Sequence, residues 1–256
     1  MNTASLARLA LCTTVPTLIN AQLSHSPIPN ERENLSVQYD QSRWQLIKRV
    51  NVVFRSDGMP SKILLLKSRK QTGSNGVGEP MNDVELLISQ GDRVLYDYAK
   101  QGATSSEYNG TRFFMDDYLE IRDVTGGGLP EVLFHSGSQG ASDSLTLEHI
   151  LHYDKPTGSV IDIAPQEFFA SGTHGLGWLM LKGRASLVIA TRNWKSTTPL
   201  EERCHYCPSL FNYDVYQWNN QEKRFRVHRH LLGEKDYEDA DQALNGDWLL
   251  IQQAER

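Results

Sequence analysis

The feature that most constrains the fold is a series of paired apolar runs, each pair separated by a short turn. The clear pairs are 46–54 with 62–68, 83–89 with 93–99, 177–182 with 186–191, and 211–218 with 224–232. Each run has strand length, and each connection carries glycine, asparagine or aspartate, which is the pattern of a β-hairpin. We therefore predict a mostly β protein of antiparallel hairpins and meanders, propeller-blade-like or sandwich-like.

The C-terminal region has a different pattern. Residues 236–244 are predicted to form a short helix, and Asn245-Gly246 is a turn dipeptide that should end it. The apolar run that follows, Trp248 to Gln252, is predicted to be a last strand.

The N-terminus resembles an export signal. Residues 1–21 carry one positive charge, Arg8, then an uncharged apolar run and a small residue, Ala21, where cleavage is expected. The alternative is a disordered arm. Residues 22–43 are polar and lack periodicity, so we expect a flexible leader, followed by a single β domain over 44–256. The predicted location is the periplasm or the outside of the cell.

The charge balance argues against one class of partner. The formal net charge is −5, whereas a nucleic-acid binder needs a basic face that displaces counterions from phosphates. No stretch approaches the roughly 20 apolar residues of a transmembrane helix. We therefore expect neither a nucleic-acid partner nor a transmembrane segment.

The cysteines fit an oxidising compartment. Removal of the signal would also remove Cys12 and leave Cys204 and Cys207, an even count that predicts a disulfide. Two alternatives remain open: a metal site that also uses His228 and His230, and a redox-active pair.

The stretch DVTGGGLPE is similar in spacing to a calcium loop, in which alternate residues supply oxygen ligands. Asp123, Thr125 and Glu131 occupy the first, third and ninth positions, but Gly127 stands where a carboxylate is expected. We predict that any calcium site here would use these three residues as ligands and would lack one carboxylate. The alternative is a glycine-rich turn that shapes a hairpin and needs no cofactor.

The longer stretch DVTGGGLPEVLF resembles the loop and strand of FG-GAP (integrin-propeller-like) repeats, as found in small exported bacterial proteins of unknown function. The similarity covers residues 118–153, with a looser one over 204–226. The resemblance implies a β fold of blade-like meanders and no particular chemistry. The glycine at position 127 departs from the aspartate of the repeat, and only one such loop is present.

One motif suggests catalysis. The sequence SGSQG, residues 136–140, approaches the G-x-S-x-G nucleophile elbow, with Ser138 as nucleophile and His174 as candidate base. An elbow must lead into a helix, so a helix over 142–153 would favour an enzyme and a strand would favour a non-catalytic module.

The sequence therefore favours an exported, non-enzymatic β module of the cell envelope, with a binding or structural role. Its partner would be an unknown ligand or an envelope protein. The alternative is an exported serine hydrolase that uses Ser138.

Overall fold

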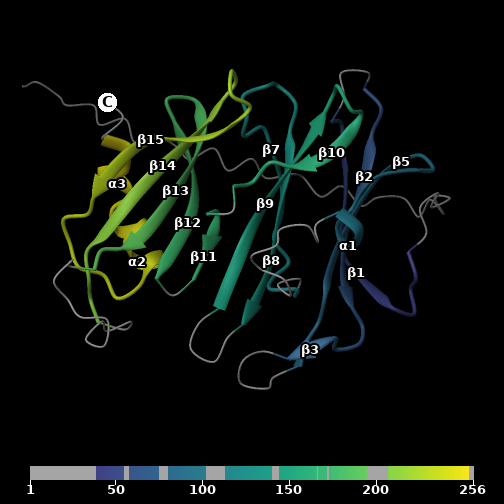
Figure 1. The fold of residues 1–256 in the computed structure, drawn as a ribbon, viewed down its shortest axis with the longest axis horizontal. Coiled ribbons are helices and arrows are strands. Elements are labelled where there is room, and N and C mark those ends of the chain that lie inside the picture. The colour runs from purple at the N-terminus through teal and green to yellow at the C-terminus, as the bar shows by residue number, and fades with distance from the viewer. Residues whose placement is uncertain are drawn as a thin grey trace, which may run out of the picture. The chain divides into compact units, whose positions relative to one another are not determined.

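The described part of the chain consists of three main antiparallel sheets, a short two-stranded sheet and three short helices, two of them at the C-terminal end (Figure 1). The computed structural model describes residues 39–54, 58–74, 80–101, 113–139, 144–165, 167–171, 173–194 and 207–253. All of them belong to the unit Ser36–Arg256. Each main sheet is built around a four-stranded meander of consecutive segments, which confirms the mostly β, antiparallel prediction.

The first sheet has the strand order β1-β2-β5-β6. Its elements, with the short β3–β4 pair and helix α1, are β1 (Trp44–Val52), β2 (Ser61–Ser68), β3 (Gly73–Ser74), β4 (Pro80–Met81), β5 (Val84–Gln90), β6 (Arg93–Asp97) and α1 (Tyr98–Gln101). Alternate residues of a strand point to opposite faces. In β2 Ile63 and Leu65 lie in one buried cluster and Leu64 and Leu66 in another, so both faces are covered.

The second sheet has the order β10-β9-β8-β7, and β11 also pairs with β9. Its strands are β7 (Leu119–Arg122), β8 (Glu131–Gln139), β9 (Ser144–Asp154), β10 (Ser159–Asp162) and β11 (Phe169–Ala170). The loop that begins at Asp123 joins β7 to β8, as the hairpin prediction requires.

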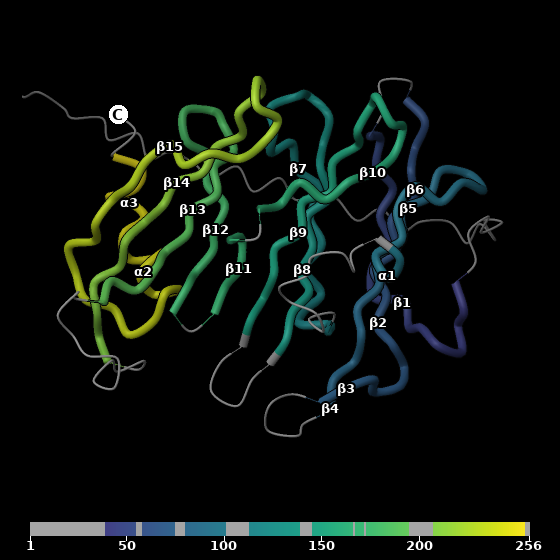
Figure 2. Tube along the Cα trace, in the orientation of Figure 1, coloured from purple at the N-terminus to yellow at the C-terminus, as the bar shows by residue number. Residues whose placement is uncertain are grey.

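The third sheet has the order β12-β13-β14-β15. Its strands are β12 (His174–Leu181), β13 (Arg184–Arg192), β14 (Phe211–Asn219) and β15 (Arg224–Leu232). All four hairpins predicted from the paired runs are therefore present. The trace in Figure 2 follows the three sheets in chain order, with each sheet completed before the next begins.

The C-terminal strand prediction was wrong. Two helices, α2 (Ala240–Gly246) and α3 (Trp248–Gln253), follow β15. The side chain of Asp239 accepts a hydrogen bond from the backbone N–H of Gln242 at 2.8 Å, so α2 begins later than predicted. The second helix forms because the Ile251 N–H donates to the Asp247 carbonyl at 3.0 Å, which turns Ile251 into the core.

Three apolar clusters hold these layers together. The cluster between the first and second sheets, here the first interface, includes Ile63, Leu65, Leu86, Tyr98, Val132, Phe134 and Leu151. The cluster between the second and third sheets, here the second interface, includes Leu133, Ile150, Phe168, Leu187, Tyr216 and Phe225. The cluster between the third sheet and the helices includes Leu179, Val188, Phe211, Tyr213, Ala243 and Ile251. Both faces of the second and third sheets are therefore buried.

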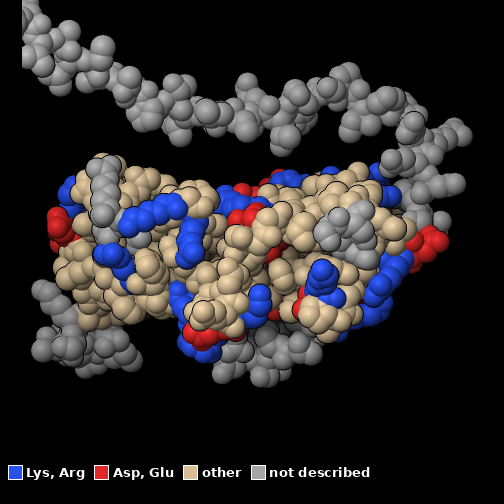
Figure 3. All heavy atoms as spheres, turned by 90° about the horizontal axis from the view of Figure 1, so that it is seen from above, with Lys and Arg blue, Asp and Glu red and all other residues tan. Residues whose placement is uncertain are grey.

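On the face drawn in Figure 3, the charges of the described residues do not form one continuous basic area. In Figure 3, Lys and Arg side chains lie in separate groups, with acidic and uncharged residues between them. On the 222–226 segment, the Glu222 carboxylate pairs with both Arg224 and Arg226. None of the described helices is long and apolar enough to cross a membrane.

Candidate ligand-binding site

The Asp123 loop is organised by its own backbone. Asp123 Oδ1 accepts hydrogen bonds from the N–H groups of Gly126 (2.7 Å) and Gly127 (3.1 Å), and Oδ2 accepts one from Gly128 (2.8 Å). Gly126 and Gly128 have φ angles of 70° and 77°, which favour glycine. The carboxylate is therefore already the acceptor of three loop N–H groups. These groups would lose their acceptor if the carboxylate turned to bind a metal ion.

Glu131, the other predicted carboxylate ligand, is buried at the start of β8. It accepts hydrogen bonds from the Val124 N–H (2.8 Å) and the Thr125 hydroxyl (3.0 Å), and it lies 2.9 Å from His152 Nδ1. Among the described residues, no three His, Cys, Asp or Glu side chains are grouped to hold a metal. These contacts support the role of a hairpin turn, and calcium binding stays a prediction.

Ser138 does not lie on a nucleophile elbow. It is part of β8 and pairs with Leu145 of β9, and β9 replaces the helix that the hydrolase alternative requires. The candidate base, His174, begins β12 in the third sheet, where its Nδ1 lies 2.9 Å from the Thr173 hydroxyl. The observed strand is the outcome that favours a non-catalytic module.

Several predictions lie outside the described residues. The signal peptide 1–21 and residues 22–38 of the leader are among them, whereas residues 39–43 form a turn before β1. Cys204 is also outside, so its pairing with Cys207 stays a prediction.

A different serine takes part in a hydrogen-bonded line across the first interface. The Tyr98 hydroxyl donates to Ser136 Oγ at 2.8 Å, and Ser136 Oγ lies 2.8 Å from His149 Nε2. His149 Nδ1 lies 2.6 Å from Asp162 Oδ2. With the proton assigned to Nδ1, the serine donates to the histidine and the histidine to the aspartate. This is the order of a Ser-His-Asp triad.

The burial of these hydrogen-bonded residues distinguishes them from an active site. Ser136 is 0% exposed and His149 is 9% exposed, and the His149 ring stacks on Phe134 at 4.5 Å. A substrate carbonyl cannot reach Ser136 in this arrangement. The sequence analysis chose Ser138, which alternation in β8 places on the same face as Ser136 and Phe134, so the strand pattern does not distinguish the two serines. The cross-strand pairing that brings His149 to Ser136 has no signal in the sequence.

A second buried polar group lies on the opposite face of the second sheet. His135 Nδ1 is 2.8 Å from Asp116 and its Nε2 is 2.8 Å from Glu148, which also accepts a hydrogen bond from the Trp178 indole at 3.1 Å. Although burial alone would lower it, the hydrogen bonds with the two carboxylates raise the pKa of His135 to about 9. His135 thus bridges two carboxylates, and the bond from Trp178 to Glu148 ties the second and third sheets together.

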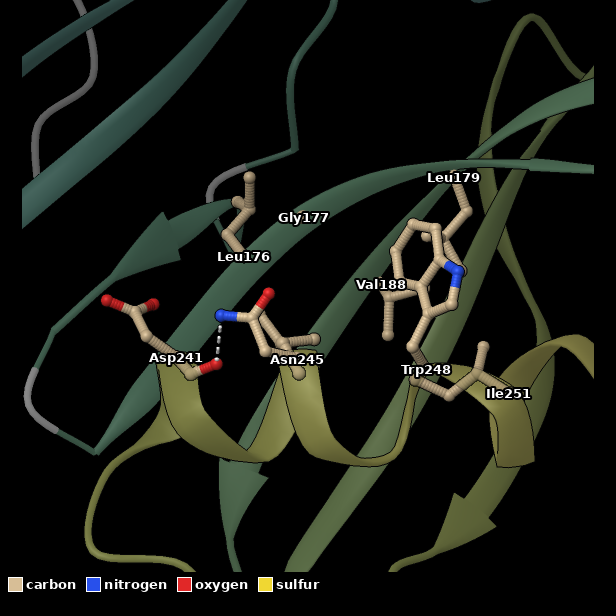
Figure 4. Close-up of a pocket in the computed structure, with 9 residues that line it drawn as sticks. Leu176, Gly177, Leu179, Val188, Asp241, Asn245, Trp248 and Ile251 are labelled. Atoms are coloured by element: carbon tan, nitrogen blue, oxygen red, sulfur yellow. Dashed lines mark hydrogen bonds between the residues drawn. The ribbon is translucent and has the colours of Figure 1, made fainter. Parts of the chain in front are cut away.

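A pocket lies where α2 and α3 cover β12 and β13 (Figure 4). Its volume is about 260 Å³, and its lining residues are Leu176, Gly177, Leu179, Val188, Asp241, Leu244, Asn245, Trp248 and Ile251. In Figure 4, Asp241 and Asn245 lie on one side of it and Trp248 on the other. The floor is apolar, and the polar atoms lie on the helical side.

The pocket exists because the joint between the two helices is fixed to the sheet. The buried Asp247 carboxylate accepts hydrogen bonds from the hydroxyls of Tyr213 (2.8 Å) and Tyr237 (2.7 Å). Burial and the contact with Asp247 raise the pKa of Tyr237 to about 12. Gly175 lets α2 approach closely, since a Cβ there would lie 2.9 Å from the Ala240 side chain. Two residues further along β12, Gly177 leaves space that the helices do not fill.

The polar groups of the pocket differ from those of the two interfaces. Asn245 Nδ2 donates to the Asp241 carbonyl at 2.9 Å, which leaves Asn245 Oδ1 as an acceptor. Within the described part of the chain, nothing donates to the Asp241 carboxylate or to Asn245 Oδ1. Trp248 is 39% exposed, and its indole nitrogen points away from Asn245 in Figure 4.

The sequence analysis missed this site because it placed Trp248 in a strand. Asp241 and Asn245 stand at positions i and i+4 of α2, which share one face of that helix, and Trp248 begins α3 two residues after α2 ends. That spacing is the signal that could have revealed the site.

The fold defines the class of protein as a mostly β chain of stacked antiparallel meanders that ends in two short helices. No family model and no curated protein matches the sequence. Among solved structures the chain is similar to one titled "Crystal structure of CarG", with 11% sequence identity and a TM-score of 0.39. The similarity covers 52% of this chain and 92% of that one.

Proposed function

We propose that this protein is an exported, non-enzymatic binding module whose ligand site is the pocket between the third sheet and the two C-terminal helices. The observation that carries the proposal is the contrast in hydrogen bonding. Ser136, His149 and His135 in the two interfaces have hydrogen-bond partners inside the protein, whereas no described residue donates to the Asp241 carboxylate or to Asn245 Oδ1, and both residues line the pocket.

The composition of the pocket supports binding rather than catalysis. Ligand pockets are mostly apolar with a few polar groups that fix orientation, and volumes start at about 300 Å³ for drug-sized ligands. A volume of about 260 Å³ therefore suits a small ligand. Its lining has no histidine, cysteine or serine that could act as a base or nucleophile.

The test is a titration with n-hexanol, a neutral probe, followed by the indole N–H signals in an NMR spectrum. The chain has five tryptophans, and we expect a saturable shift at Trp248. In Gly177→Val the pocket is filled, since a Cβ there lies 3.7 Å from Leu244, an ordinary contact. This variant should fold and lose the shift. No saturable shift at Trp248 in the wild type would reject the proposed site.

Export, the disulfide and calcium are tested together by the native mass of protein purified from the exporting cell, before and after a chelator. We expect a chain that lacks residues 1–21 and two hydrogens, from a Cys204–Cys207 disulfide. A mass of about 40 Da that the chelator removes would establish calcium at Asp123, Thr125 and Glu131. An uncleaved chain in the cytosol would overturn export.

A serine hydrolase is the second candidate, favoured by the order of Ser136, His149 and Asp162. A fluorophosphonate probe on the folded protein decides between the two. The binding module predicts no labelling, because Ser136 is fully buried and Ser138 lacks the elbow. Labelling that Ser136→Ala or Ser138→Ala abolishes would favour the hydrolase.

A further inference from the structure

We infer that the pocket selects a small alkylammonium ligand, with an aliphatic stem on the apolar floor and a cationic head near Asp241 and Asn245. This inference rests on the proposed function and adds the chemical class of the ligand. It starts from the arrangement in Figure 4, where Asp241, Asn245 and Trp248 follow one another along the helical side of one pocket.

The floor suits a hydrocarbon stem. Leu179, Val188 and Ile251 are buried residues of the same apolar cluster, and they line the pocket from two strands and α3. These side chains offer no hydrogen-bond partner, so a polar group placed there would lose its water without compensation. An aliphatic chain instead gains about 25 cal/mol per Å² of apolar surface removed from water.

The rim suits a positive head. Asp241, Asn245 and Trp248 line it, and a carboxylate, an amide oxygen and an indole ring each attract a cation. None of the lining residues is Lys, Arg or His, so the pocket holds no internal counterion for Asp241. An anionic head would meet the carboxylate without a compensating donor side chain.

The position of Asp241 in the helix also suits a negative charge. It lies in the first turn of α2, where a negative charge is favoured by the helix dipole. Its backbone carbonyl is held by Asn245, which fixes the two residues relative to each other. The acceptor pair is therefore present before a ligand arrives.

The test compares three probes of the same length: n-hexylammonium, n-hexanol and n-hexanoate, each titrated at neutral pH and followed at the Trp248 indole signal. We expect dissociation constants on the order of millimolar for probes of this size. Hexylammonium should bind about two- to fivefold more tightly than hexanol, the gain of a solvent-accessible ion pair, and hexanoate more weakly than both. The preference should shrink in high salt.

The outcomes separate the two claims. The stated order supports both the site and its ligand class. Equal binding of the three probes, or a preference for hexanoate, overturns the charge selectivity and leaves the binding site intact. Absence of a saturable Trp248 shift with all three probes overturns the site itself.

A matched pair of variants locates the selectivity. Asp241→Asn keeps the shape of the side chain and should reduce the hexylammonium preference to near one, while hexanol binding stays the same. Asp236→Asn removes the same charge from an exposed position outside the pocket and should leave the preference unchanged. An equal loss in both variants would assign the preference to net charge and contradict the inference.

Discussion

The first interface and the C-terminal pocket use similar side chains in opposite ways. In the interface, Ser136, His149 and Asp162 form a line in which each donor meets an acceptor inside the protein. In the pocket, Asp241 and Asn245 keep acceptors that no described residue uses. The interface has the residue order of a Ser-His-Asp triad but is buried, whereas the lining of the pocket includes exposed residues and no histidine, cysteine or serine.

The contrast teaches that residue type alone does not distinguish structural polar groups from binding groups. The presence of hydrogen-bond partners and the degree of solvent exposure do. A buried polar group without a partner costs about 1–3 kcal/mol, so a folded chain pairs its buried donors and acceptors. A half-exposed acceptor is solvated by water and can remain unpaired until a ligand arrives. Substitutions should therefore affect stability in the first region and binding in the second.

The largest effect is expected for Asp162→Ala. Its Oδ2 faces His149, and its Oδ1 accepts from the N–H groups of Ile150 (3.1 Å) and Ala164 (3.0 Å). Three donors lose their acceptor, so we expect a loss of about 2–4 kcal/mol in the free energy of unfolding, measured with urea. Asp154→Ala, in an exposed turn of the same hairpin, should cost below about 1 kcal/mol. Equal costs would contradict the structural role of the line.

The next effect is a pH dependence from Glu85, a buried residue whose carboxylate accepts from the Ala99 N–H at 3.1 Å. Burial, with a smaller contribution from Asp97, raises the pKa of Glu85 to about 7. The folded state therefore binds this proton more tightly than the unfolded state. The resulting stability is present below a pH of about 4.3 and is lost as the pH rises through 7.

Urea denaturation across the pH range measures this contribution. Glu85 should account for a loss of about 2–3 kcal/mol between pH 5 and 8 in the wild type, and Glu85→Gln should remove that part of the decline. His135, with its pKa raised to about 9, contributes stability that is present below a pH of about 6.5 and is lost as the pH rises through 9. That second decline should persist in Glu85→Gln. Parallel curves for the two proteins would contradict the assignment to Glu85.

A smaller effect distinguishes two serines of one strand. Ser136→Ala removes the acceptor of Tyr98 and the donor to His149, and it should cost about 1–3 kcal/mol of unfolding free energy. Ser138→Ala, two residues further along β8, should change it by less than about 0.5 kcal/mol. A larger cost at Ser138 would reverse our assignment of the structural serine.

The smallest effect on stability belongs to the pocket. Asp241→Asn should change the unfolding free energy by less than about 1 kcal/mol, because it removes only a favourable helix-dipole contact. A loss above that range would place Asp241 among the structural carboxylates, and the comparison of the two regions would fail.

The hairpins were predictable because their signals are local. Alternating apolar residues and turn residues at 211–232 or 177–191 identify a strand pair without any knowledge of its neighbours. The Asp123 turn was predictable for the same reason. The helix α3 was not, since Trp248 to Gln252 is a short apolar run that fits a strand or a helix equally, and packing of Ile251 decides between them.

The two polar sites were harder to predict, for different physical reasons. The Ser136 line depends on the register that places β9 beside β8 and on the position of β10, which are properties of the folded sheet. The pocket depends on the buried Asp247, whose tyrosine partners come from β14 and from the segment before α2. Long-range contacts of this kind leave no pattern in neighbouring residues.

The most direct test compares the two regions in one NMR spectrum, through the indole N–H signals of Trp178 and Trp248 during an n-hexylammonium titration. The Trp178 indole already donates to Glu148 in the second interface, and Trp248 borders the pocket. We predict a saturable shift at Trp248, none at Trp178, and loss of the Trp248 shift in Gly177→Val. Equal shifts at both signals, or an unchanged Trp248 response in Gly177→Val, would contradict the account.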